Sequence, residues 1–217
     1  DRLESFYRGQ ATSYDSFRRR LLPGRSELIQ LLDLPAGGSW FDMGGGTGTN
    51  LEFAGERLRD LAEVHLIDLC PSLLEVAAQR IRKSGWTNVT PVLDDAIQYT
   101  ASGLADVITF SYSLTMIPDW FAAVDNAARL LKPGGHIGVV DFHVSRKYPK
   151  RGRSRQGWFT RSLLPVWFGC DNVFLSHDHL SYLEQRFRPI AVREGQTRIP
   201  WVPFVRAPYY LFIGRNE

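Results

Sequence analysis

The feature of this sequence that most restricts its fold is the regular alternation of short apolar runs with helix-like stretches between residues 39 and 142. The apolar runs have the composition of β-strands and lie at residues 39–43, 64–69, 89–93, 106–112 and 136–142. Two stretches with a helical pattern, residues 73–83 and 119–131, follow Pro71 and Pro118, which suit a first helical turn. Strands that alternate with helices form largely parallel sheets covered on both faces, so we predict an α/β fold.

The flanking segments complete the expected domain. Residues 1–35 are predicted to form an N-terminal helical region, and residues 132–135 (Lys-Pro-Gly-Gly) a turn that closes the preceding helix. An insert rich in Pro, Arg and Trp occupies residues 144–176, and a further helix is predicted at residues 177–187. The five strands above and two final ones would give a seven-stranded sheet. Because 217 residues with 44% apolar content can bury a substantial core, we assign residues 1–217 to a single domain.

The cysteine content and hydropathy exclude several classes of protein. Cys70 and Cys170 stand a hundred positions apart without a Cys-x-x-Cys pair, so we expect no metal site, no disulfide framework and a reducing compartment. No run of 18 or more apolar residues is present, so no segment is expected to span a bilayer. The first residue is Asp1 rather than Met, which favours a domain excised from a longer, fused protein.

A glycine cluster follows the first predicted strand, where open α/β sheets bind their ligands. Asp42 is followed by Gly44, Gly46 and Gly48, which let the backbone approach a ligand closely. The dinucleotide fingerprint G-x-G-x-x-G fails by one residue, because Thr49 stands at its last position. A nicotinamide enzyme nevertheless remains an alternative, and so does a glycine turn with a purely structural role.

Acidic residues follow the next two predicted strands. Asp68 ends the second strand, and one carboxylate there can accept hydrogen bonds from both ribose hydroxyls of an adenosine. Asp95 and Ala96 follow the third strand. Three acids after three successive strands therefore predict a nucleoside-binding edge, although a single strand-end aspartate often serves the fold alone.

The spacing D-x-G-x-G-x-G resembles the first motif of the class I S-adenosylmethionine-dependent methyltransferases, and Leu131-Lys132-Pro133-Gly134-Gly135 is also typical of them. The resemblance implies a Rossmann-like sheet with helices on both faces. It implies S-adenosyl-L-methionine as cofactor and S-adenosyl-L-homocysteine as product. The residues that we expect to contact the cofactor are Tyr14, Arg25, Asp42, Gly44, Gly46, Gly48, Asn50, Asp68, Leu69, Asp95, Ala96 and Ser111.

A more particular resemblance extends over nearly the whole chain. It rests on Tyr7, Gly9, Gln10, Tyr14-Asp15, Leu22-Pro23-Gly24-Arg25, residues 110–120, Trp167-Phe168, residues 171–175 and residues 206–210. These segments resemble the N-methyltransferase of betaine lipid synthesis. That likeness implies three successive methyl transfers to diacylglyceryl homoserine, giving diacylglyceryl trimethylhomoserine. It also implies a 3-amino-3-carboxypropyl transferase as partner, fused to this domain or separate.

The expected methyl transfer requires no metal ion and no covalent nucleophile from the protein. A neutral amine attacks the sulfonium methyl group in line, so the protein has to align the reactants, exclude water and keep the amine unprotonated. The candidate catalytic residues are Tyr14, Ser111, Tyr112 and His143. His143 could accept a proton, but a lone histidine can equally be structural, and both tyrosines could be packing residues whose hydroxyl groups are bonded elsewhere.

Aromatic and basic side chains are the candidates for substrate binding, namely Tyr112, Trp120, Arg206 and Tyr209. Trp120, Trp158 and Trp167 could stabilise the methylated cation by cation–π contacts. Arg25 is assigned to the cofactor carboxylate and Arg206 to that of the homoserine headgroup, although either could be a solvated surface charge.

A basic and aromatic segment at residues 146–168 predicts contact with a membrane surface. Residues 143–170 contain seven basic side chains and no acidic one, although the net charge of the chain is only +3. Basic residues interleaved with Trp, Phe and Leu are typical of interfacial anchors. We therefore expect a cytoplasmic protein that is peripheral to the membrane, at the endoplasmic reticulum if eukaryotic. A solvated loop with a lid of aromatics is the alternative interpretation.

Other functions remain open. The insert lacks an RNA-binding module, so nucleic acid is not expected as a partner. Within the methyltransferases, the second choice is an enzyme that methylates phosphatidylethanolamine or another small amine. A third hypothesis, from a different class, is an inactive cofactor-binding scaffold domain.

Overall fold

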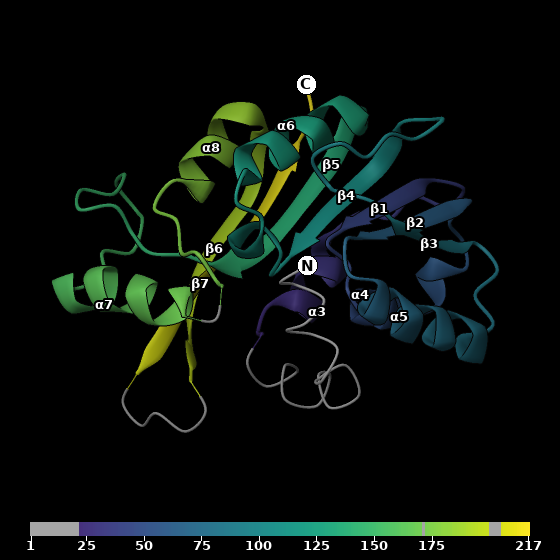
Figure 1. Cartoon of the computed structure of the whole chain (residues 1–217). Coiled ribbons are helices and arrows are strands. Elements are labelled where there is room, and N and C mark those ends of the chain that lie inside the picture. The colour runs from purple at the N-terminus through teal and green to yellow at the C-terminus, as the bar shows by residue number, and fades with distance from the viewer. Residues whose placement is uncertain (1–21, 171, 200–204) are drawn as a thin grey trace.

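One twisted sheet organises the protein, and its strands alternate with helices (Figure 1). The computed structural model describes residues 22–170, 172–199 and 205–217. The sheet has seven strands in the order β3-β2-β1-β4-β5-β7-β6. β1 to β5 run parallel, and β7 pairs antiparallel with β5 and β6. The strands are β1 Ser39–Met43, β2 Glu63–Asp68, β3 Val89–Leu93, β4 Ala105–Ser111, β5 Leu131–Phe142, β6 Arg188–Arg198 and β7 Arg206–Arg215.

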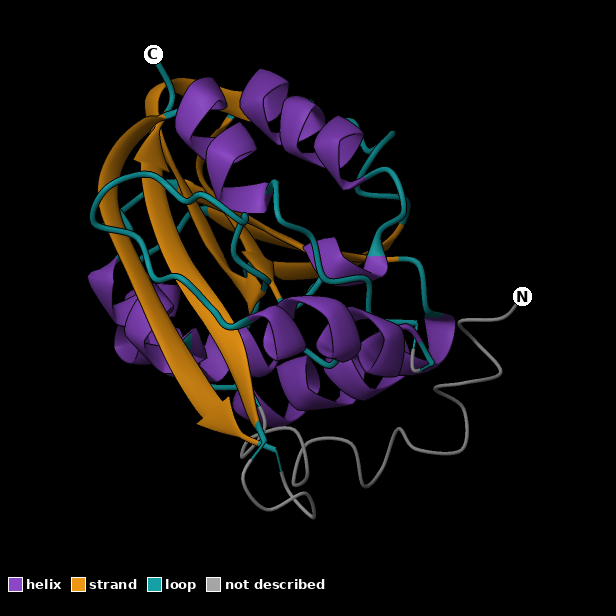
Figure 2. Cartoon of the chain, turned by 90° about the vertical axis from the view of Figure 1, so that its left-hand side faces the viewer, coloured by secondary structure: helices purple, strands orange, loops and turns teal. Residues whose placement is uncertain are grey.

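Helices cover both faces of the sheet, which confirms the predicted α/β architecture (Figure 2). Figure 1 shows α6 and α8 on one side and α3, α4 and α5 on the other. The helices are α3 Arg25–Leu31, α4 Thr49–Ala54, α5 Pro71–Ser84, α6 Trp120–Leu130, α7 Trp158–Gly169 and α8 His179–Arg186, with short 3-10 helices η1 Gly55–Leu58 and η2 Leu114–Met116.

The buried strands are apolar at nearly every position because successive side chains point to opposite faces of the sheet and helices cover both of these faces. In β1, Trp40 belongs to the cluster under α3, α4 and α5, whereas Phe41 belongs to the cluster under α6 and α8. In β5, Val140 packs on the first side and Val139 on the second. This alternation explains why the strands read as nearly continuous apolar runs.

One sequence prediction about elements was wrong, and one helix was not predicted. Residues 132–135 form no turn but belong to β5, because Gly134 N and Gly135 O pair with the backbone of Asn216, just beyond β7. The insert at residues 144–176 contains a helix, α7, that the alternation of elements did not predict. The expected N-terminal helical region is represented by α3, and the rest of it up to residue 21 lies outside the described residues. None of the described helices is long and apolar enough to cross a membrane.

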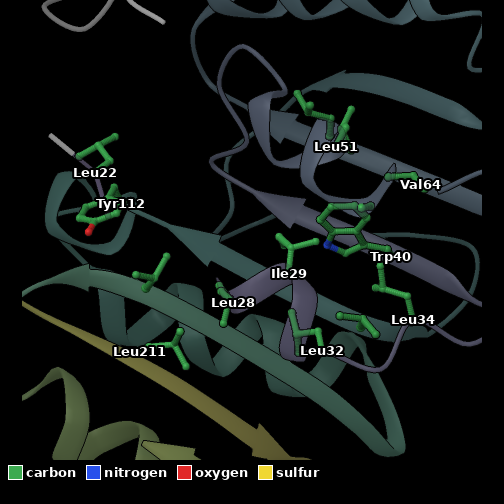
Figure 3. Close-up of a cluster of buried hydrophobic side chains, with 14 of the residues drawn as sticks. Leu22, Leu28, Ile29, Leu32, Leu34, Trp40, Leu51, Val64, Tyr112 and Leu211 are labelled. Carbon is green, nitrogen blue, oxygen red and sulfur yellow. The ribbon is translucent and has the colours of Figure 1, made fainter. Parts of the chain in front are cut away.

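A glycine in β5 determines how closely α3 packs on the sheet. A Cβ at Gly138 would lie 2.7 Å from Leu32 Cδ1 and 3.2 Å from Leu28 Cδ1. Leu28 and Leu32 are buried with Ile29 and Trp40 in the cluster shown in Figure 3. The absence of that one side chain therefore allows α3, which begins at Arg25, to lie directly against the strand.

Candidate active site

The glycine cluster forms a tight loop between β1 and α4. Gly44, Gly46 and Gly48 all have positive φ angles, of 69°, 57° and 73°. A Cβ at Gly44 would lie 2.5 Å from the Cβ of Ser113, so only glycine fits there. Gly44 N and Gly45 N also donate hydrogen bonds to Ile67 O, at 2.8 and 3.0 Å. The loop is thus held against the ends of β2 and β4.

Asp42 supports this loop from beneath. Its carboxylate is fully buried and accepts hydrogen bonds from Asn50 Nδ2, at 3.0 and 3.1 Å, and from Thr109 Oγ1, at 2.6 Å. Burial raises the pKa of Asp42, whereas the hydrogen bonds from Thr109 and Asn50 and the charge of Arg25 lower it. Asp42 and Asn50 therefore bond to each other below the loop and do not line the cavity above it.

Asp68 ties the end of β2 to the glycine loop. One carboxylate oxygen accepts a hydrogen bond from Gly46 N at 2.8 Å, and the other accepts one from Cys70 N at 2.8 Å. Burial raises the pKa of Asp68, and the two backbone donors oppose that rise. Each oxygen retains capacity for a further hydrogen bond. Asp68 therefore both fixes the loop and borders the cavity.

A cavity of about 160 Å³ lies at the carboxyl ends of the central strands. The residues that line it include nine of those predicted from the sequence: Arg25, Gly44, Gly46, Asp68, Leu69, Asp95, Ala96, Ser111 and Tyr112. Because the strand order is β3-β2-β1-β4, Asp95 and Ala96 border the β3 side and Ser111 and Tyr112 the β4 side. Asp95 also accepts a hydrogen bond from Ile97 N at 2.9 Å, which orders the turn after β3.

Arg25 joins the β4 side of the cavity to the glycine loop. Its Nε donates hydrogen bonds to Asn50 Oδ1 and to Ser111 Oγ, both at 3.1 Å. Its guanidinium also lies over the ring of Phe53, with 5.9 Å to the centroid. Arg25 is therefore a positioned cation in the wall of the cavity, where a carboxylate of either cofactor or substrate could bind.

Tyr112 occupies a special backbone position just after β4. Its φ angle is 56°, and its hydroxyl group donates a hydrogen bond to Pro23 O at 2.7 Å. Its ring packs edge-on against Phe142, with 4.7 Å between ring centroids. Burial raises the pKa of Tyr112. The ring borders the cavity, while the hydroxyl group is engaged with the chain that leads into α3.

The remaining predicted residues lie elsewhere. Gly48 belongs to the glycine loop but does not line the cavity, since a Cβ there would lie 3.0 Å from Leu66 Cδ1, and Tyr14 is outside the described residues. Trp120 packs against His179 of α8, with 4.6 Å between ring centroids. Arg206 is exposed at the start of β7, and the nearby Tyr209 ring lies close to Gly24 and Gly195.

His143 lines a separate cavity of about 70 Å³ on the far side of β5. Its Nε2 lies 3.6 Å from a carboxylate oxygen of Glu194 and has no hydrogen-bond partner among the described residues. Burial lowers the pKa of His143 to about 4. The structure therefore does not bring His143 together with the residues of the larger cavity.

Several lining residues were missed by the sequence analysis. Ser113 donates a hydrogen bond to Met43 O at 3.0 Å, and its place after β4 was the signal that could have identified it. Asp94 also lines the cavity, directly beside the predicted Asp95. Leu22, Met116 and Ile117 add apolar surface, and no motif distinguishes them from ordinary core residues.

Comparison with known proteins agrees with this geometry. Residues 14–187 match a family described as a methyltransferase domain. The chain is 33% identical over 141 residues to nocamycin O-methyltransferase from Saccharothrix syringae, covering 64% of this chain and 48% of that protein. It is 30% identical over 104 residues to the ubiquinone/menaquinone biosynthesis C-methyltransferase UbiE of Shewanella halifaxensis, covering 46% and 41%. The chain spans about half the length of the curated relatives it matches.

Solved structures share the fold. The N-methyltransferase NodS from Bradyrhizobium japonicum, in complex with S-adenosyl-L-homocysteine, has a TM-score of 0.64 and 18% identity, over 94% of this chain and 97% of that one. The YcgJ protein from Bacillus subtilis has a TM-score of 0.69 and 15% identity, over 89% and 98%. The fold, the glycine loop and the family match together define the class, so the chain belongs to the S-adenosylmethionine-dependent methyltransferases.

Proposed function

We propose that this domain transfers methyl groups to the amine of a diacylglyceryl homoserine headgroup, in three successive steps that give the trimethylated betaine lipid. The observation that carries the N-methyl part of the proposal is the lining of the cavity on its β4 side. Among the described residues, Leu22, Arg25 and residues 111–118 contribute no histidine, lysine or carboxylate to this lining. An amine attacks through its lone pair without a base, whereas a hydroxyl acceptor benefits from one.

The polar groups on this side are already engaged. The hydroxyl group of Tyr112 donates to Pro23 O, that of Ser113 donates to Met43 O, and Ser111 Oγ accepts from Arg25. The apolar surface of Leu22, Met116 and Ile117 disfavours the ammonium form and so keeps the amine nucleophilic. Rate would then come from alignment and from exclusion of water.

The residues present fit S-adenosylmethionine, which supplies an activated methyl group when bound. At Gly46, a loop residue that lines the cavity, a Cβ would meet nothing nearer than 3.8 Å, so the absence of a side chain leaves room for a ligand, and Asp68 offers carboxylate oxygens beside it. Asp68 would hold the ribose hydroxyls, Arg25 a carboxylate, and the ring of Tyr112 the acceptor side. The N-methyltransferase NodS supports nitrogen as acceptor, while the O- and C-methyltransferases among the relatives show that the class alone does not fix the acceptor atom.

The lipid headgroup is supported by the sequence resemblance along nearly the whole chain. With that substrate, the proposal includes a 3-amino-3-carboxypropyl transferase, fused or separate, that supplies the homoserine lipid. It also includes a peripheral position on the cytoplasmic side of a membrane. The competing substrates are phosphatidylethanolamine and other small amines, which would use the same in-line chemistry.

The direct test combines labelled S-adenosylmethionine with mixed micelles that contain either diacylglyceryl homoserine or phosphatidylethanolamine, and resolves the lipid products by mass. We expect stepwise gain of one, two and three methyl groups on the homoserine lipid alone. Methylation of phosphatidylethanolamine instead would replace the substrate, and cofactor binding without any product would favour the scaffold hypothesis. An Asp68→Ala variant serves as the control without cofactor.

A further inference from the structure

Helix α7 has its apolar side turned to solvent. Phe159, Leu163 and Val166 are spaced as i, i+4 and i+7 and form one stripe. Trp158, Phe159 and Val166 are each 69% exposed, whereas Arg161 on another side of the helix has its Nε buried. A helix that packs on a core normally shows the reverse pattern. We call the exposed stripe with its flanking tryptophans the α7 face: Trp158, Phe159, Leu163, Val166 and Trp167.

The α7 face is fixed to the wall of the cofactor cavity. Leu164 is buried, and the ring of Phe168 packs edge-on against Phe142, with 5.2 Å between ring centroids. Phe142 in turn packs on Tyr112, which borders the cavity. Just after α7, Phe174 N donates a hydrogen bond to Thr115 O of η2 at 2.7 Å. Figure 1 shows α7 at the edge of the molecule, away from α6 and α8.

Unpaired cations lie in the segment that leads into α7. Arg146 pairs with Asp178, and Lys150 and Arg153 both pair with Glu184. In contrast, three exposed basic residues form no ion pair with a described residue, and they are Lys147, Arg151 and Arg155. The free positive charge is therefore in the segment directly before the exposed apolar helix.

We propose that the α7 face, with Lys147, Arg151 and Arg155, docks on the surface of an anionic lipid bilayer. This inference rests on the proposed function, since a diacyl substrate stays in its membrane. Tryptophan and phenylalanine side chains partition to the headgroup level, and basic side chains add attraction to acidic lipids. The free cations favour this occupant over a second copy of the chain, whose own α7 segment carries the same positive charge.

Docking through the α7 face would bring the acceptor side of the cavity close to the bilayer. The contacts from Phe168 through Phe142 to Tyr112 connect the membrane-facing helix to the acceptor side of the cavity. A headgroup at the bilayer surface would therefore enter beside the apolar residues Leu22 and Met116. The lipid chains can then remain in the bilayer while the amine reacts.

Sedimentation with vesicles tests the proposal without any turnover. The purified protein is mixed with vesicles of phosphatidylcholine alone or of phosphatidylcholine with phosphatidylserine, at low and at high salt. We expect binding to the anionic vesicles that decreases with salt. Trp158→Ser/Phe159→Ser/Val166→Ser and Lys147→Gln/Arg151→Gln/Arg155→Gln should each weaken this binding roughly tenfold or more, and the second variant should also flatten the salt dependence.

Matched controls separate docking from folding and from charge alone. Arg82→Gln/Lys83→Gln/Arg188→Gln removes three exposed charges away from α7, and Phe121→Ser removes an exposed aromatic on α6; both should bind vesicles like the wild type. Cofactor affinity should stay within twofold in every variant, which reports an intact fold. The proposal is overturned if the wild-type protein ignores anionic vesicles, or if the α7 and control variants lose binding equally. It is also overturned if the α7 variants merely abolish a dimer. Because these vesicles contain no homoserine lipid, a wrong substrate assignment leaves the result unchanged.

Discussion

The edge of the sheet that we propose binds the cofactor and the α7 face differ in the chemistry of their side chains. At the cofactor edge, the buried carboxylates of Asp42 and Asp68 each accept at least two hydrogen bonds. On the α7 face, large apolar side chains are exposed and have no covering partner among the described residues. Satisfied polar groups in a crevice indicate a small ligand, whereas uncovered apolar groups on a convex helix indicate a large partner.

The contrast also shows how two kinds of binding can share one enzyme. The glycine loop and Asp68 are set by adjacent strands of the parallel sheet. The α7 face lies on a helix held to the sheet by Leu164 and Phe168. Changes at one site should therefore leave the other intact, and the following experiments test that independence in order of expected effect.

The largest effect is expected for Asp68→Ala. The change removes the predicted ribose contacts and the hydrogen bonds that the carboxylate accepts from Gly46 N and Cys70 N. Hydrogen bonds to a charged group are worth about 1.5 to 3 kcal/mol each, so cofactor affinity should fall about a hundredfold or more. Calorimetric titration with S-adenosylhomocysteine measures this, with the exposed Asp60→Ala as control. Unchanged affinity would remove the ribose assignment, and altered vesicle binding would break the proposed independence.

Gly44→Ala should have a smaller effect on the same region. The new Cβ would lie 2.5 Å from the Cβ of Ser113, and the residue would keep a φ near 69°. We expect about 1 to 3 kcal/mol of lost stability and roughly tenfold weaker cofactor binding. Gly103→Ala is the matched control, since its Cβ would meet nothing within 4 Å. Equal behaviour of the two variants in thermal melts and titrations would contradict the close approach of the loop to Ser113.

His179 differs from Asp42 and Asp68, because it is a buried polar residue without hydrogen-bond partners among the described residues. Burial lowers its pKa to about 3, so below about pH 6.5 the unfolded chain binds a proton that the native protein does not. The free energy of unfolding should therefore fall as the pH is lowered through this range. His179→Phe should reduce that slope by about 1.4 kcal/mol per pH unit. Urea unfolding of both proteins at several pH values measures the slope, and identical slopes would refute the assignment.

The smallest effect is expected for Tyr112→Phe. The hydroxyl group donates to Pro23 O, so its loss should cost about 1 kcal/mol of stability. Because that hydroxyl group is engaged away from the acceptor, the rate of methyl transfer should fall less than about threefold. Single-turnover rates measure this, with the exposed Tyr148→Phe as control. A larger loss of rate would give the hydroxyl group a catalytic role.

The sheet could be predicted well from the sequence because buried parallel strands are continuous apolar runs with polar ends. The strands at residues 39–43 and 89–93 agree with the structure at both ends. The cofactor edge was predictable for a related reason, since the glycines and Asp68 lie next to strand ends in the sequence. The extension of β5 to Leu131 was not, because it depends on pairing of Leu131 with Ala105 of β4 and of residues 134–135 with Asn216 near the other end of the chain.

The side of the sheet that each site residue faces could not be predicted as reliably. Phe142 packs towards Tyr112 and the cavity, while its neighbour His143 packs against Tyr210 on the opposite face. A shift of one position in a strand reverses the direction of the side chain. The α7 pattern had the same ambiguity, since a periodic stripe shows which residues share a face but not whether that face is covered.

The glycine in β5 has a consequence for engineering and for natural variation of this enzyme. Gly138 allows α3 to lie against the sheet, and α3 begins with Arg25, which bonds to Asn50 and Ser111 in the cavity wall. A side chain at position 138 would push α3 away from the sheet and would move the guanidinium of Arg25 out of the cavity wall. The position of the Arg25 guanidinium in the cavity wall therefore depends on the absence of a side chain at Gly138 of β5, a residue that does not itself line the cavity.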